Sequence, residues 1–94
     1  MHILTEDERQ EWLSHNTDWS LQGNEISASY KFKNFVEAVG FMTMIAIEIE
    51  RKNHHPTIIN MYNKVQISMT THDAGNVITN KDTDLAEIIS KLKR

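Results

Sequence analysis

Two of the five histidines in this sequence stand side by side, His54 and His55, directly before the only proline, Pro56. A third histidine, His72, follows a stretch in which apolar and polar residues alternate. The unperturbed pKa of imidazole is about 6.5, so a histidine can donate or accept a proton near neutrality. If the fold brings His72 to the adjacent pair, the three side chains could form an acid–base site.

Other interpretations of these residues stay open at this point. A histidine in a loop often only faces solvent, and Asp82 could simply cap a helix. Three neutral imidazoles could hold zinc with one open position. Adjacent histidines point in different directions, however, and the sequence contains no HxH or HxxxH spacing. We therefore do not expect a metal site.

Glu50 lies four residues before His54, which is the spacing of side-chain neighbours on a helix. If the last helical turn persists, the Glu50 carboxylate would reach the His54 imidazole and fix its tautomer.

Composition places the chain among small globular domains and removes several function classes. Its 94 residues are 39% hydrophobic and carry a formal net charge of −3, which predicts one domain over residues 1–94. No basic stripe is present, so we expect no direct nucleic-acid binding. The absence of cysteine excludes a disulfide framework and a thiolate nucleophile, and fits a cytoplasmic protein. No signal peptide or membrane-spanning stretch is recognisable, so we expect no membrane partner.

The hydrophobic periodicity predicts seven elements in the order helix, two strands, helix, two strands, helix. Thr5 and Glu8 have capping-box spacing before the first helix, Gly23-Asn24 suits a hairpin turn, and Asn34 can cap the long helix. Asp82 or Thr83 can cap the last helix, which is expected to begin directly after the capping residue. The other predicted ranges are 6–14, 18–22, 25–32, 35–52, 58–62 and 65–71. This order is typical of an α+β fold, with helices packed on one face of an antiparallel sheet.

The long helix is more widely apolar than a domain of this size requires. Its flanks carry further apolar residues, so we expect a second subunit to cover part of it. The residues predicted for its core face are Phe35, Ala38, Val39, Met42, Ile45, Ala46 and Ile49.

A longer pattern runs through Glu50, His54-His55-Pro56, Tyr62, His72 and Asp82. The surrounding text, NHHPTIINMYNKVQISMTTHDAG followed by KDTDLA, resembles the pterin-4a-carbinolamine dehydratases over nearly the whole chain. The resemblance implies a four-stranded antiparallel sheet with three helices on one face. It also implies a homodimer or homotetramer.

In this family a tetrahydropterin with a hydroxyl at C4a loses water to give the quinonoid dihydropterin, which belongs to tetrahydrobiopterin recycling. The resemblance implies no metal or other cofactor. It implies that His54 and His72 are the acid–base pair, and that His55, also catalytic, mainly positions the pterin. The substrate-binding residues that it implies are Glu50, Pro56, Thr71, Asp73, Ala74 and Asp82.

Two departures from the family pattern concern the walls of the site. Ile58 stands where many relatives have tryptophan, and the loop after His72 is one residue longer than in many relatives. Two alternative functions remain open. One is a non-catalytic partner that associates through the long helix, as some family members do with a transcription factor. The other is the same chemistry on a different pterin.

Overall fold

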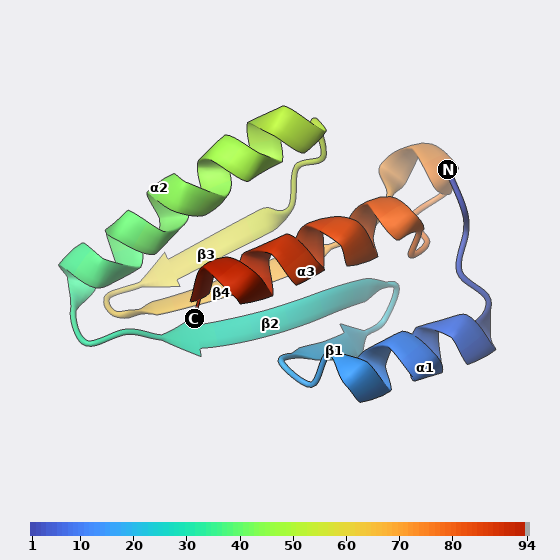
Figure 1. The fold of residues 1–94 in the computed structure, drawn as a ribbon, viewed down its shortest axis with the longest axis horizontal. Coiled ribbons are helices and arrows are strands. Elements are labelled where there is room, and N and C mark those ends of the chain that lie inside the picture. The colour runs from blue at the N-terminus through green and yellow to red at the C-terminus, as the bar shows by residue number, and fades with distance from the viewer. Residues whose placement is uncertain (94) are drawn as a thin grey trace.

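The computed structural model describes residues 1–93 and contains the seven predicted elements in the predicted order (Figure 1). They are α1 (Glu6–His15), β1 (Trp19–Gln22), β2 (Glu25–Lys31), α2 (Phe35–Lys52), β3 (Thr57–Met61), β4 (Lys64–Met69) and α3 (Asn80–Lys93), with a short 3-10 helix, η1 (His72–Ala74), after β4. The predicted α+β fold is confirmed. Among the described residues, no helix combines the length and apolar character needed to cross a membrane.

The four strands form one antiparallel sheet in the order β1-β2-β4-β3. Strand partners such as Ala28 and Ile67 lie directly opposite each other and are buried beneath the helices. Ser29 and Gln66, the next pair along the same two strands, are exposed on the opposite face. The period of two therefore separates a helix-covered face from an open face, which is polar on β2 and β4 and carries the exposed Ile59 and Met61 on β3.

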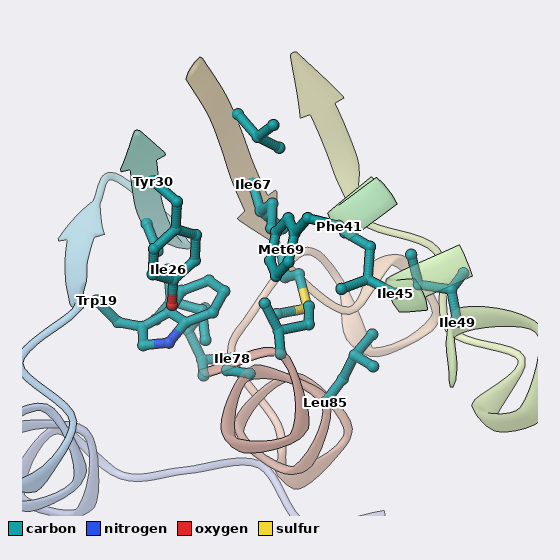
Figure 2. Close-up of a cluster of buried hydrophobic side chains, with 14 of the residues drawn as sticks. Trp19, Ile26, Tyr30, Phe41, Ile45, Ile49, Ile67, Met69, Ile78 and Leu85 are labelled. Atoms are coloured by element: carbon teal, nitrogen blue, oxygen red, sulfur yellow. The ribbon is translucent and has the colours of Figure 1, made fainter. Parts of the chain in front are cut away.

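The core fills the space between the sheet and the helices. Figure 2 shows side chains from β1, β2 and β4 converging with those of α2 and α3. Each fully buried large apolar side chain contributes about 1.5–3 kcal/mol relative to an exposed one. This layer fixes α2 and α3 against β4, so the ends of these elements have set positions. The labelled residues in that figure are Trp19, Ile26, Tyr30, Phe41, Ile45, Ile49, Ile67, Met69, Ile78 and Leu85.

The predicted core face of α2 was partly wrong. Ala38, Ile45 and Ile49 are buried as expected, but Phe41 is buried too, whereas Phe35 is 49% exposed. Val39 and Ala46 are also exposed. Because apolar residues surround most of this helix, periodicity alone could not select the side that packs against the sheet and α3.

The start of α3 also differs from the prediction, because the helix begins at Asn80 and not after Asp82. The Thr79 hydroxyl accepts a hydrogen bond from the Lys81 backbone N–H at 3.2 Å. In return, Oδ2 of Asp82 accepts one from the Thr79 backbone N–H at 2.9 Å. This pair is similar to a capping box with Thr79 at the N-cap, except that its hydroxyl accepts from the second helical N–H and not the third. Asp82 therefore lies in the first turn and points back toward the helix start.

At α1 the predicted capping box is present and carries an additional partner. Oε1 of Glu8 accepts a hydrogen bond from the Thr5 backbone N–H at 2.8 Å, and the His2 ring lies 2.9 Å from both Glu8 oxygens. The Thr5 hydrogen bond, assisted by His2, holds the pKa of the Glu8 carboxyl below its ordinary value of 4.5. A proton on Glu8 would therefore weaken the start of this helix.

We expect the stabilisation that comes from the Glu8 charge to depend on pH. Because the pKa of Glu8 is lowered in the folded protein, the charge stabilises the fold above the ordinary glutamate pKa. That contribution is lost as the pH falls through the lowered value. Glu8→Gln should thus lower the urea midpoint at pH 7, and the difference from the wild type should disappear in acid. Glu6→Gln, in the same helical turn, is the control, and an equal and pH-independent loss in both variants would contradict this origin.

Candidate active site

The three histidines of the predicted site line one small hollow in the structure. His54 and His55 follow α2, where Asn53 takes a left-handed conformation (φ 50°) and ends the helix. His72 begins η1, just beyond the end of β4. The C-terminal ends of α2 and of the inner strand β4 thus place the three imidazoles around the same hollow. We call this hollow of about 170 Å³ the histidine pocket; it is lined by Asn53, His54, His55, Thr70, Thr71, His72, Asp73 and Lys81.

A larger groove of about 550 Å³ adjoins the histidine pocket and shares His55, Thr70 and His72 with it. We call it the sheet groove; its remaining lining residues are Gln22, Gly23, Asn24, Glu25, Thr57, Ser68 and Asn76. A volume of this order suits a small organic ligand. Thr70 lines both hollows, and its hydroxyl is buried without a hydrogen-bond partner among residues 1–93.

His54 is held by a buried carboxylate. Its Nε2 lies 2.6 Å from Oδ1 of Asp82, whose side chain is 0% exposed while that of His54 is 11% exposed. The other Asp82 oxygen accepts hydrogen bonds from the Thr71 hydroxyl at 2.8 Å and from the Thr79 backbone N–H at 2.9 Å. Three donors therefore converge on one carboxylate, and the pairing leaves Nδ1 of His54 for chemistry.

The hydroxyls behind Asp82 form a chain with one direction. Thr71 donates to the carboxylate, so the 2.7 Å contact between the Thr71 and Thr79 hydroxyls requires Thr79 to donate to Thr71. Thr79 in turn accepts from the Lys81 backbone N–H at the start of α3. Asp82 is thus fixed by the helix terminus, and it lines neither hollow itself but contacts His54 and Thr71, which line the histidine pocket. The prediction that Asp82 is the N-cap was wrong, because Asp82 lies in the first turn of α3.

Glu50 contacts His55 and not His54, which corrects the pairing predicted from helical spacing. Nε2 of His55 lies 3.1 Å from Oε1 of Glu50, and both side chains are largely exposed. The helix ends at Lys52, and the left-handed turn at Asn53 carries His54 away from the four-residue register of Glu50. An exposed pair of this kind holds its geometry weakly.

His72 has an uncharged partner. Its Nδ1 lies 2.6 Å from Oδ1 of Asn76, and both residues line the sheet groove. An amide oxygen only accepts hydrogen bonds, so Nδ1 carries the proton and Nε2 has the free lone pair. Each histidine of the site therefore has one ring nitrogen engaged by a different partner and one nitrogen available.

The remaining predicted residues have varied positions. Thr71 is 3% exposed and serves the Asp82 network, while Asp73 lines the histidine pocket. Pro56 and Ala74 are partly buried and line neither hollow. Ile58 pairs with Ile67 across β3 and β4 and also lines neither hollow. Among residues 1–93 no cluster of three or more His, Cys, Asp or Glu side chains could hold a metal ion.

Sequence reasoning missed several residues that line or support the site, among them Thr70, Thr79, Asn76 and Gln22. Thr79 was detectable, because it stands three residues before Asp82, the spacing of a capping box. Thr70, Asn76 and Gln22 carried no local signal, since their roles arise from the way β4, its following loop and the hairpin meet.

The comparisons with known proteins agree with this fold and identify the family. The family model described as pterin 4 alpha carbinolamine dehydratase matches residues 2–92. A protein of Prochlorococcus marinus, strain NATL2A, is 41% identical over 90 residues, covering 96% of this chain and 94% of its own. One from Picosynechococcus is 45% identical over 89 residues, covering 95% and 96%. Both bear the name "Putative pterin-4-alpha-carbinolamine dehydratase". The chain belongs to the pterin 4 alpha carbinolamine dehydratase family.

Two solved structures extend the comparison. A transcriptional coactivator/pterin dehydratase from Brucella melitensis superposes with a TM-score of 0.92 at 35% identity, covering 98% of this chain and 99% of its own. A pterin dehydratase-like protein, identified as a RuBisCO assembly factor in the alpha-carboxysome, gives a TM-score of 0.70 at 20% identity over 84% of this chain and 93% of its own. At that identity the second structure shares the fold alone.

Proposed function

We propose that this protein dehydrates a 4a-hydroxytetrahydropterin, the carbinolamine made when tetrahydrobiopterin serves a hydroxylase, to the quinonoid dihydropterin. The observation that carries the proposal is the shared pocket in which His54, His55 and His72 each keep one ring nitrogen available. In the reaction the N5 lone pair forms a C4a=N5 double bond as the C4a–O bond breaks. One proton goes to the departing oxygen, which leaves as water, and one proton leaves N5.

The partners of the histidines support a division of these two proton transfers. Protonated His54 would hold its positive charge against the Asp82 carboxylate, whereas His72 faces only the Asn76 amide. We assign proton donation to Nδ1 of His54 and proton acceptance to Nε2 of His72. His55, tethered to Glu50 at the mouth of the pocket, would position the pterin ring.

The remaining substrate contacts follow from the residues around the pocket. The Ala74 N–H already donates to the Thr71 carbonyl at 3.2 Å, so we assign the contact with the pyrimidine edge of the pterin to the remaining backbone groups of Asp73 and Ala74 in η1.

A stopped-flow assay of carbinolamine loss tests the proposal directly. The carbinolamine is generated in the mixing chamber, and its decay is followed with and without the purified protein. We expect acceleration over the spontaneous reaction by about 10²–10⁴-fold, the scale of general acid–base catalysis. Decay at the spontaneous rate would reject the proposed activity.

A second candidate function is that of an interaction protein, favoured by the exposed apolar residues of α2. Val36 is 77% exposed and Ile47 is 56% exposed on this helix.

We propose that a second copy of the chain covers this surface in a homodimer or homotetramer. Sedimentation should show an oligomer, and Ile47→Glu should shift it toward monomer; a wild-type monomer at micromolar concentration would contradict the association. An oligomer that fails the stopped-flow assay would favour the interaction role.

A further inference from the structure

Asn76 has a backbone conformation that few residues adopt and a side chain that reaches into the site. Its φ is 60°, and the preceding Gly75 has a φ of 89°. The Asn76 backbone N–H donates to the Thr71 carbonyl at 3.0 Å, and the Thr71 N–H donates to the Val77 carbonyl at 3.0 Å. These bonds tie both ends of the loop to the end of β4. The side chain of Asn76 therefore starts from a fixed backbone position.

Glycine would satisfy the same backbone with less strain, because it has no Cβ to oppose a positive φ. Asparagine tolerates this region better than most residues but gains little from it. What asparagine adds here is an amide, whose oxygen lies 2.6 Å from Nδ1 of His72. The positive φ alone therefore does not account for asparagine at this position, and the hydrogen bond to His72 gives its side chain a separate role.

We propose that Asn76 is a positioning residue that fixes His72 as its Nδ1–H tautomer and leaves the Nε2 lone pair as the proton acceptor. This inference rests on the proposed dehydratase function and adds a residue to it. In water an imidazole side chain prefers the opposite tautomer, with the proton on Nε2. Without Asn76, Nε2 of His72 would therefore mostly present a proton where the reaction needs a lone pair.

Asn76 differs from the partners of the other two site histidines because its side chain carries no charge. Asp82 and Glu50 bring negative charge to His54 and His55, whereas Asn76 orients His72 with an uncharged oxygen. An uncharged acceptor fixes a tautomer without drawing a second proton onto the ring. That combination suits a histidine that must begin each turnover neutral.

Nitrogen-15 NMR of the full chain tests the tautomer without any assay of activity. Long-range correlations distinguish a protonated from an unprotonated ring nitrogen, and we expect the neutral ring of wild-type His72 to carry its proton on Nδ1. In Asn76→Gly, which preserves the positive φ, the proton should move toward Nε2. Asn76→Asp retains an oxygen acceptor and should keep the wild-type tautomer. His15, an exposed residue at the end of α1, serves as the internal reference.

The kcat and KM values of the same variants show whether Asn76 positions His72 for catalysis or only supports the fold. Asn76→Gly should lower kcat about 10-fold while KM changes little, and Asn76→Asp should recover part of the loss. A wild-type His72 protonated at Nε2, or a tautomer that Asn76→Gly leaves unchanged, would overturn the proposal. If the wild type showed no dehydratase activity, the proposed function would fail, and the NMR result would still decide whether Asn76 sets the tautomer.

Discussion

His54→Ala and His72→Ala are each expected to remove most of the acceleration of carbinolamine loss, about 10²–10⁴-fold in kcat. Each variant removes one of the two ring nitrogens that we assign to proton transfer, Nδ1 of His54 or Nε2 of His72. Substrate binding should change less, because the groove walls and His55 remain in place. Stopped-flow measurements at several pterin concentrations separate the two parameters. Full activity in either variant would remove that histidine from the mechanism.

The two variants should differ sharply in stability, which separates catalysis from folding. His54→Ala leaves the buried Asp82 oxygen without its partner, and a hydrogen bond to a charged group is worth about 1.5–3 kcal/mol. His72 is exposed, so His72→Ala should change the free energy of unfolding by less than about 0.5 kcal/mol. His15→Ala, which removes an exposed histidine far from the pocket, is the matched control for both measurements. Equal destabilisation by His54→Ala and His72→Ala would contradict the buried pairing.

Local signals in the sequence predicted the elements well. The capping residues Thr5 and Asn34 do bind the backbone N–H groups expected of them, and α2 has the predicted bounds. These signals act within one turn of chain, so neighbouring residues contain them completely. The packed side of α2 was harder to predict, because burial of Phe41 in place of Val39 depends on the sheet and α3.

The partners within the site could not be predicted from spacing. His54 and Asp82 are separated by 28 residues, and only the packing of α3 beside the end of α2 brings them together. Helical spacing predicted His54 as the partner of Glu50, whereas the partner is His55. The prediction assumed that the helix continues to His54, but it ends at Lys52 and Asn53 is left-handed. The residue types and their positions predicted the three histidines, and the resemblance to the family implied their roles, whereas their hydrogen-bond partners became apparent only in the fold.

Asp82→Asn should lower kcat strongly while leaving the protein folded. The new amide oxygen can accept the hydrogen bonds that Thr71 and Thr79 now give to Oδ2. Its NH₂ group would then face Nε2 of His54, so the ring must move its proton to Nδ1 to avoid two opposed donors. Nδ1 could no longer pass a proton on while the ring stays hydrogen-bonded. We expect a loss of about 10²-fold in kcat, with little change in KM.

Two further variants, Asp82→Ala and Asp84→Asn, serve as comparisons for Asp82→Asn. Asp82→Ala removes the acceptor altogether and leaves buried donors unpaired, so it should destabilise the fold by about 3–5 kcal/mol. Asp84→Asn makes the same chemical change at an exposed position of α3 and should alter neither property. Because Asp82 acts through His54, adding Asp82→Asn to His54→Ala should cost almost no further activity. A further large loss in that double variant would mean that Asp82 reaches the substrate by another route, which its complete burial argues against.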